Sequence, residues 1–178
     1  MTDLETALLT TPAGLLAVVV DPIDGTIVVS GFSPLADQQR RLAEPLRDRG
    51  FRPVHRSVAM SSVAAAVADY TDGDCDALDR VAVRQSGGPF LQAAWAALRG
   101  VRAGRTASYT ELARLAGRPN AVRAAGSACA RNMVAPFVPC HRILRSDGTL
   151  GGYEYGLATK AALLRHEHAL PAPPALFP

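Results

Sequence analysis

One stretch decides the fold of the second half of this chain: YTELARLAGRPNAVRAAGSACAR, which runs from Tyr109 to Arg131. Its first part predicts a short helix from Tyr109 to Ala116, which ends at a Gly-Arg-Pro break. A second helix is expected from Asn120, taken as its N-cap, to Arg131. Two short helices separated by such a break are typical of a helix-turn-helix.

The second helix of this pair consists almost entirely of small residues, with Arg123 and Arg131 near its ends. Tight packing alone can explain such a composition. A surface of small residues also allows close approach to a narrow groove, whereas helices that read the major groove present long side chains. If this helix meets DNA, we expect a shallow, weakly sequence-specific contact in the minor groove.

Outward from the helix pair, the pattern divides the chain near Gln85-Ser86-Gly87-Gly88. Residues 1–85 predict an α/β domain, residues 86–170 predict a mainly α-helical domain, and the Pro-rich residues 171–178 predict a loose tail. The further expected elements are strands at Leu15–Val20, Thr26–Gly31 and Arg80–Arg84, and helices at Pro34–Arg49, Val58–Tyr70, Pro89–Leu98 and Leu157–His168.

Charge is distributed unevenly between these two parts. Through Gln85 the chain has eight Arg and Lys residues against twelve Asp and Glu, and beyond it eleven against four. A basic half attached to an acidic half indicates a polyanion as partner of the second half. No run approaches the roughly 18 apolar residues of a membrane span, and the acidic N-terminus does not resemble a signal peptide. We therefore expect a cytoplasmic protein with no membrane partner.

The three cysteines, Cys75, Cys129 and Cys140, are widely spaced and form no Cys-x-x-Cys pair. This spacing argues against a disulfide framework and against a zinc site, and His55 with Cys75 would supply too few ligands. The alternating aspartates within residues 72–76 resemble part of a calcium loop, but the rest of that pattern is missing. We interpret them as a solvated loop and expect no metal.

Cys140 is the candidate nucleophile, because it precedes His141 and Arg142 and follows an apolar run. A buried thiol is inert unless a base or a positive field activates it. In an extended segment adjacent side chains point to opposite sides, so His141 would act on the sulfur through a water molecule. Glu167 is the carboxylate expected to orient the other ring nitrogen. A lone Cys-His pair is more often structural, so this pair alone does not establish chemistry.

The residues around this pair carry more information. The sequence Pro-Cys140-His-Arg, followed by Gly-Gly-Tyr153, resembles the active-site signature of the O6-alkylguanine-DNA alkyltransferases. The resemblance implies a ribonuclease-H-like α/β domain, followed by a mainly α domain with a winged-helix-like helix-turn-helix. It extends in order and spacing over residues 88–167, through Phe90–Trp95, Thr106–Tyr109, Arg123–Gly126, Asn132 and Leu163–Glu167.

The resemblance also implies direct-reversal DNA repair. An alkyl group would move irreversibly from guanine O6, or from thymine O4, to Cys140, and the stable thioether product would limit each molecule to one reaction without a cofactor. His141, a water molecule and Glu167 would maintain the thiolate. Tyr109 would donate a proton toward guanine N3, and Asn132 would brace the hinge between the recognition helix and the active-site segment.

The implied partner is double-stranded DNA, bound through its minor groove with the alkylated guanine flipped out, and the sequence leaves open whether copies of the protein cluster on it. Arg123 would enter the base stack and offset the stacking lost on flipping. Glu154 and Tyr155 stand where relatives often carry smaller residues, which predicts a narrow pocket that favours methyl over benzyl groups. The implied DNA contacts are Tyr109, Arg123, Ala124, Ala125, Gly126 and Ser127, and the implied pocket residues are Val138, Pro139, Tyr153, Glu154 and Tyr155.

Three alternatives stay open at this point. A non-catalytic sensor that binds alkylated DNA would lack the acceptor, and the presence of Cys140 argues against it. A cysteine hydrolase would require an oxyanion hole, which the sequence does not signal. A transcriptional regulator would need an additional metal-binding domain, for which a chain of this length leaves no room.

Overall fold

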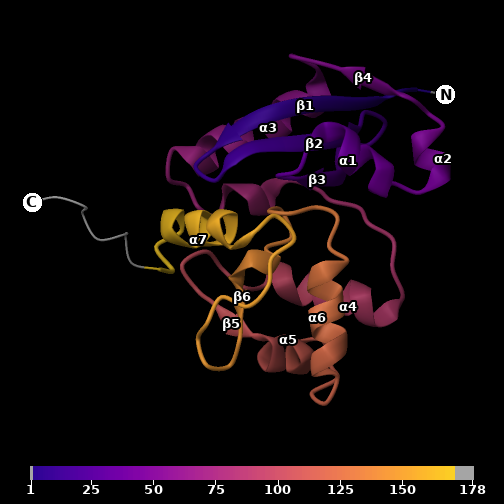
Figure 1. Ribbon diagram of the computed structural model, residues 1–178. Helices are drawn as coiled ribbons and strands as arrows, with labels where there is room; N and C mark the ends of the chain where they lie inside the picture. The colour runs from indigo at the N-terminus through magenta and orange to yellow at the C-terminus, as the bar shows by residue number, and fades with distance from the viewer. Residues whose placement is uncertain (1, 171–178) are drawn as a thin grey trace, which may run out of the picture.

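The computed structural model describes residues 2–170, so the predicted Pro-rich tail at residues 171–178 lies outside the described part. The first part of the chain forms a four-stranded sheet in the order β3-β2-β1-β4 (Figure 1). β1 (Leu4–Thr11), β2 (Gly14–Asp21) and β3 (Thr26–Gly31) are antiparallel, and β4 (Phe51–Pro53) pairs with β1 in parallel. The sequence correctly predicted β2 and β3. It missed β1 and β4, because β1 alternates polar and apolar residues only weakly and β4 has three residues.

The helices of this part differ from expectation at one place. The single helix predicted at Pro34–Arg49 is wrong: α1 (Leu35–Arg41) and α2 (Glu44–Arg47) are separated by extended backbone. The cause is Pro45, whose ring would clash with the carbonyl of Arg41 in a continuous helix. α3 (Val58–Thr71) forms as predicted, with the Ser57 hydroxyl accepting from the Met60 amide. The strand predicted at Arg80–Arg84 is also wrong, because a 3-10 turn, η1 (Ala77–Arg80), and one isolated bridge at Val83 stand there.

The second part is mainly helical, as predicted. α5 (Tyr109–Leu115) begins with a capping box made by Ser108 and Glu111. α6 (Val122–Ala130) begins after Ala121, so the prediction of Asn120 as its N-cap is wrong. The other elements are α4 (Pro89–Arg99), β5 (Ala107–Ser108), the 3-10 turn η2 (Cys140–Arg142), β6 (Ile143–Leu144) and α7 (Leu157–His166), and β5 and β6 form a short parallel pair.

The two parts share one hydrophobic core. α7 lies between the sheet and the other helices of the second part (Figure 1). One buried cluster contains residues from both parts of the chain: Ile27 of β3, Tyr70 of α3, Leu98 of α4, Leu163 of α7, and Phe137 between α6 and η2. The boundary predicted near Gln85 therefore stays a prediction about sequence organisation. No helix among residues 2–170 is long and apolar enough to cross a membrane.

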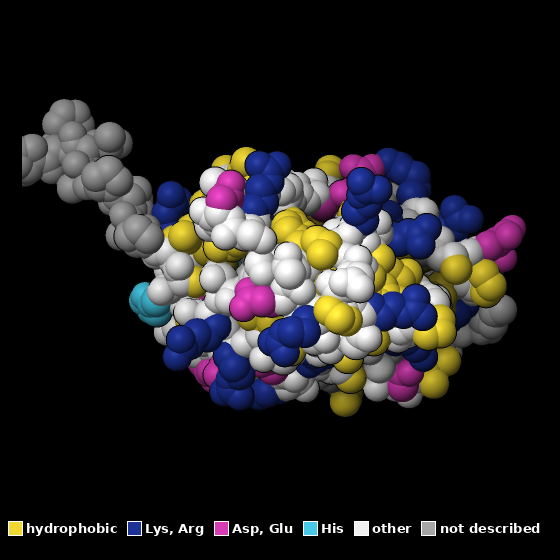
Figure 2. Space-filling view, turned by 90° about the horizontal axis from the view of Figure 1, so that it is seen from below, with side chains coloured by type: hydrophobic (Ala, Val, Ile, Leu, Met, Phe, Trp, Pro, Cys, Tyr) yellow, Lys and Arg dark blue, Asp and Glu magenta, His cyan; other side chains and the backbone are white. Residues whose placement is uncertain are grey.

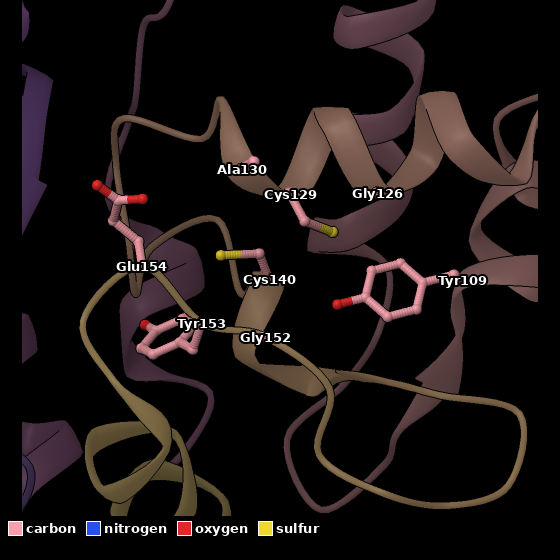
Figure 3. Close-up of a pocket in the computed structure, with 8 residues that line it drawn as sticks. All are labelled: Tyr109, Gly126, Cys129, Ala130, Cys140, Gly152, Tyr153 and Glu154. Carbon is pink, nitrogen blue, oxygen red and sulfur yellow. The ribbon is translucent and has the colours of Figure 1, made fainter.

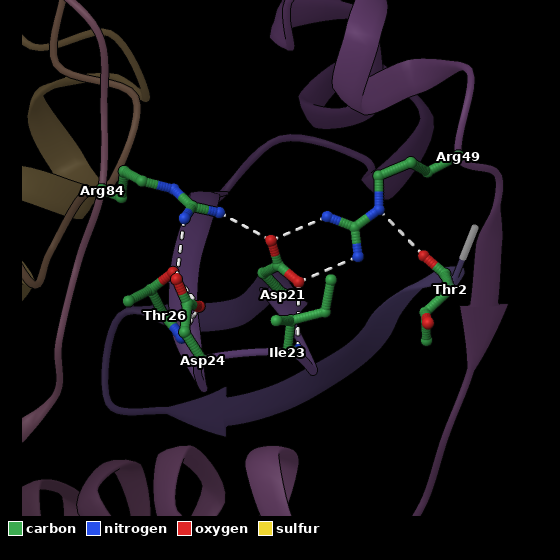
Figure 4. Close-up of polar contacts among 7 residues, drawn as sticks. All are labelled: Thr2, Asp21, Ile23, Asp24, Thr26, Arg49 and Arg84. Carbon is green, nitrogen blue, oxygen red and sulfur yellow. Dashed lines mark hydrogen bonds and ion pairs between the residues drawn. The ribbon is translucent and has the colours of Figure 1, made fainter.

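A cluster of ion pairs surrounds the buried carboxylate of Asp21 at the end of β2 (Figure 4). Asp21, at the end of β2, accepts two hydrogen bonds from Arg49, at 2.7 and 2.9 Å, and one from Arg84, at 2.6 Å. The hydrogen bond from Arg49 is the main reason that the pKa of Asp21 lies well below its ordinary value. Arg49 follows α2 and Arg84 lies just before the boundary predicted near Gln85, so this carboxylate joins β2 to two later segments of the first part.

Candidate active site

A cavity of about 360 Å³ opens between α5, α6, η2 and the loop that follows β6 (Figure 3). Its volume falls within the range of roughly 300–1,000 Å³ that is usual for pockets that bind small molecules. The sulfurs of Cys140 and Cys129 and the hydroxyl of Tyr109 lie around this one space. The lining residues are Tyr109, Gly126, Cys129, Ala130, Cys140, Gly152, Tyr153 and Glu154.

Cys140 begins η2 and is only 8% exposed. The expectation that it lies in an extended segment is wrong, because residues 140–142 form a 3-10 turn. Burial raises the pKa of the thiol, while a hydrogen bond from Asn132 Nδ2 to Sγ, at 3.2 Å, acts in the opposite direction. A donor aimed at the sulfur favours the thiolate over the thiol.

His141 is fully buried behind Cys140, and its Nε2 lies 2.9 Å from Oε1 of Glu167. Burial lowers the pKa of His141, although Glu167 acts against this, and the ring is therefore neutral near pH 7. Glu167 is ionised and can only accept, so Nε2 carries the ring proton and donates a hydrogen bond to the carboxylate. The lone pair is then on Nδ1, which is buried and has no hydrogen-bond partner among the described residues. The predicted His141–Glu167 contact is thus present.

Glu167 follows α7 and is held by more than His141. Arg142 donates to it from Nε at 2.8 Å and from Nη2 at 3.0 Å, and the Tyr70 hydroxyl donates to Oε1 at 3.0 Å. Burial raises the pKa of Glu167, but His141 and Arg142 outweigh it and lower the pKa to about 2. No local pattern in the sequence indicates a role for Tyr70, because it lies 97 residues from Glu167 and in the other part of the chain.

Asn132 contacts the segment between α6 and η2 at several points. Its Nδ2 donates to the Val138 carbonyl at 2.7 Å as well as to Cys140, and its Oδ1 accepts from the Val134 amide at 3.2 Å. Gln85 was missed: its side chain donates to Asn132 Oδ1 at 3.1 Å and accepts from the Met133 amide at 2.8 Å. These contacts fix the segment between α6 and η2 on both sides.

Lys160 of α7 is a second missed residue. It is fully buried, and its ammonium donates to the carbonyls of Ile143 and Leu150, both at 2.5 Å, and of Gly152 at 3.3 Å. It therefore ties the loop that closes the cavity to β6. Burial lowers the pKa of Lys160, which the nearby thiols oppose. The signal available in the sequence was weak, since a lysine on a terminal helix usually faces solvent.

Two tyrosines with different environments border the cavity. Tyr109 is half-buried at the start of α5, and burial raises the pKa of its hydroxyl, which keeps a proton available for donation. The hydroxyl of Tyr153 is buried without a hydrogen-bond partner among residues 2–170. Burial raises its pKa well above the ordinary value, so it is also protonated.

The predicted DNA-contacting residues are only partly available on the surface. Arg123 and Ser127 are exposed on α6, Ala124 is half-buried, and Gly126 lines the cavity. Ala125 is completely buried, so its predicted DNA contact is wrong, because this position of the helix faces the core. Lys and Arg side chains are prominent over the helical end of the molecule (Figure 2), which is the side that carries α5 and the start of α6.

Three of the predicted pocket residues do not line the cavity. Val138 and Pro139 are buried, and the Val138 carbonyl accepts a hydrogen bond from Asn132. Tyr155 turns away and packs against the first part of the chain, with its hydroxyl 3.3 Å from the Ser30 carbonyl. Of the two bulky residues expected to narrow the pocket, only Glu154 borders it. Among residues 2–170 no group of three potential metal ligands comes together.

The site and its surroundings define a class of protein with a nearly buried cysteine at a small-molecule-sized cavity in a mainly helical domain. Residues 89–169 match the family model described as "6-O-methylguanine DNA methyltransferase, DNA binding domain". The O6-methylguanine methyltransferase of Mycobacterium tuberculosis is 30% identical, with a TM-score of 0.70 over 99% of this chain and 98% of that one. The chain therefore belongs to the O6-methylguanine-DNA methyltransferase family.

The chain is also similar, over part of its length, to two further proteins. It is 53% identical over 81 residues to the bifunctional transcriptional activator/DNA repair enzyme Ada of Escherichia coli, which covers 46% of this chain and 23% of that protein. It is 42% identical over 101 residues to the methylated-DNA–protein-cysteine methyltransferase of Salmonella typhimurium, which covers 57% and 59%. These matches span less than two thirds of either relative. A structure of the M. tuberculosis protein in complex with DNA aligns with a TM-score of 0.72, at 28% identity over 93% of each chain.

Proposed function

We propose that the protein repairs DNA by transferring the alkyl group of O6-alkylguanine, and of O4-alkylthymine, to Cys140 in a single irreversible reaction. The observation that supports the proposal is the cavity itself: Cys140 lines it, Asn132 donates a hydrogen bond to its sulfur, and the adjacent His141 contacts Glu167. No cofactor is required, because the protein supplies the nucleophile and the proton donors.

Activation begins at His141. Because Nε2 keeps its proton and donates a hydrogen bond to the ionised Glu167, Nδ1 is the free base, and a water molecule between it and Sγ would relay the thiol proton to the ring. Asn132 then stabilises the thiolate by its hydrogen bond at 3.2 Å. Glu167 stabilises the imidazolium that results, because it is ionised and 2.9 Å away.

In the transfer step, the thiolate attacks the alkyl carbon, a C–S bond forms, and the bond from carbon to O6 breaks with its electron pair moving into the guanine ring. Tyr109 would deliver a proton to N3 and so neutralise the negative charge that develops there, since its hydroxyl faces the cavity and is protonated. The thioether has no good leaving group, so the protein is consumed.

Access to O6 requires that the nucleotide leave the duplex, which costs a few kcal/mol. We propose that α6 lies in the minor groove, that Arg123 fills the vacated place in the stack, and that copies of the protein cluster along DNA. The exposed Arg123 and the small residues of α6 support this arrangement. We further propose a ribonuclease-H-like first domain and a winged-helix-like second domain. A cytoplasmic location stays a prediction from the sequence.

Mass spectrometry tests this function directly. The protein is mixed with a duplex oligonucleotide that contains one O6-methylguanine, and the peptide containing Cys140 is examined for a single added methyl group at one equivalent per protein. Cys140→Ala should bind the same oligonucleotide without any transfer. The matched control is Cys129→Ala, which removes a second thiol from the same cavity. Methylation of Cys129 in place of Cys140 would contradict the assignment, and tight binding without any adduct would favour the sensor.

A further inference from the structure

We propose that Arg41 of α1 is a positioning residue for the acceptor Cys140, so that the first part of the chain is a working component of the transfer site. This inference rests on the proposed function and deepens it. Arg41 belongs to the acidic half of the chain, in which the sequence indicated no catalytic or binding residue.

Arg41 bridges the two segments that shape the cavity. Its Nη2 donates to the backbone carbonyl of Asn132 at 2.9 Å, and its Nη1 donates to the hydroxyl of Tyr155 at 2.7 Å. Asn132 in turn donates from Nδ2 to the sulfur of Cys140 at 3.2 Å. One residue therefore separates Arg41 from the acceptor, and a displacement of Asn132 changes the donor that the sulfur meets.

The second acceptor, Tyr155, is anchored in the first part of the chain. Its hydroxyl lies against Gly31, where an added Cβ would overlap with it, so the absence of a side chain at Gly31 creates its place. Its ring makes edge-to-face contacts with Phe32, at 5.7 Å between centroids, and with Tyr153, at 5.5 Å. Since Tyr153 lines the cavity, the docking of Tyr155 also fixes the cavity wall.

Ser30, near the end of β3, holds the backbone that follows Asn132. The Ser30 amide donates to the Met133 carbonyl at 2.8 Å, and the Ser30 hydroxyl donates to the Ala135 carbonyl at 2.8 Å. These bonds anchor the backbone after Asn132 but leave its own carbonyl to Arg41. The planar guanidinium reaches the carbonyl and the tyrosine hydroxyl together, which the single ammonium of a lysine does less well.

Arg40 provides a matched control, because it is the neighbouring arginine on the same helix, is exposed and pairs with Asp37. The experiment compares Arg41→Ala, Arg41→Lys and Arg40→Ala with the unaltered protein. Single-turnover methyl transfer is measured from duplex DNA and from the free base O6-methylguanine, and the Kd for undamaged duplex is measured separately. The free base matters because its reaction does not depend on contacts with the DNA backbone.

We expect Arg41→Ala to slow transfer from both substrates by about 10- to 100-fold, the effect of misplacing a reacting group by roughly 1 Å. Its Kd for undamaged DNA should stay within about twofold, as expected if Arg41 makes none of the phosphate contacts that dominate non-specific binding. Arg41→Lys should recover part of the rate, and Arg40→Ala should behave like the unaltered protein.

A loss of DNA affinity with an intact free-base rate would show that Arg41 contacts DNA, and it would overturn the proposal. An unchanged rate on both substrates would do the same. If Arg41→Ala fails to fold, Tyr155→Phe decides instead: it removes the hydroxyl that Arg41 holds and should slow both reactions in the same proportion. Failure of the unaltered protein to transfer methyl at all would refute the proposed function instead, and that outcome is distinct from each of these.

Discussion

The replacement Glu167→Gln probes the centre of the site, because it keeps the shape of the side chain and removes its charge. Arg142 would then hold a buried guanidinium without a counter-ion, since its side chain is 2% exposed and that of Glu167 is 0% exposed. Removing one partner of a buried ion pair costs about 3–5 kcal/mol. Set against a total stability of roughly 5–15 kcal/mol for a typical protein, this is a large loss that urea denaturation will resolve.

The pH dependence gives a second, independent magnitude. Folding lowers the pKa of Glu167 from 4.5 to about 2, and a shift of one pKa unit corresponds to about 1.4 kcal/mol. Because the folded pKa is the lower one, this stabilisation of about 3 kcal/mol is present above pH 4.5 and is lost as the pH falls toward 2. Unfolding of the unaltered protein and of Glu167→Gln, measured from pH 7 down to pH 3, should therefore converge in acid. The lowered pKa of Asp21 also makes its stabilising contribution begin to fall below about pH 3.8, but it does so equally in both proteins.

Activity supplies the third readout. Without the carboxylate, nothing stabilises the protonated ring of His141, and methyl transfer at pH 7 should fall by about 10²- to 10⁴-fold, the usual contribution of a positioned base. Tyr70→Phe is the matched control: it removes one neutral donor to Glu167, and should cost about 1 kcal/mol of stability with little change in rate. Stability curves that stay parallel down to pH 3, or a rate within threefold of the unaltered protein, would refute this reasoning.

Three further predictions concern other parts of the molecule. Asp21→Asn should lower the free energy of unfolding by about 3–5 kcal/mol, since it leaves Arg49 unpaired with its side chain 10% exposed, and thermal unfolding checks this. Arg123→Ala should slow transfer from duplex DNA but leave transfer from the free base unchanged, because only the duplex needs a residue to replace the flipped nucleotide; equal slowing of both would contradict that role. Glu154→Gly should raise the ratio of benzyl to methyl transfer rates by widening the cavity, and an unchanged ratio would show that this side chain does not restrict it.

Much of the second part could be predicted from local sequence. The helices at Pro89–Arg99, Tyr109–Leu115 and Leu157–His166 form within a few residues of expectation, because their starts and ends depend on local signals such as the Ser108 capping box. The first part was less predictable. Its edge strand β4 exists only through pairing with β1, which lies about 47 residues away along the chain. Such pairing leaves no local pattern in three residues.

The residues of the candidate site also fall into a predictable and an unpredictable group. Cys140, His141 and Glu167 could be named from sequence, since their spacing matches a known signature. The sequence did not predict which nitrogen of His141 contacts the carboxylate. It also did not predict the 3-10 turn that replaces the expected extended backbone. Ala125 was wrongly assigned to DNA because a helix of small residues does not reveal which side faces the core.

What the sequence determined by itself is the helical character of the second part and the family to which the chain belongs, and from these it predicts Cys140 as the nucleophile. What only the tertiary structure decided is how that nucleophile is held: Tyr70 and Arg142 on Glu167, and Arg41 on the backbone of Asn132. The physical reason is that activation of a buried thiol depends on distances of about 3 Å between groups on separate elements. Periodicity and spacing report on neighbours along the chain, and these groups become neighbours only after the core has formed.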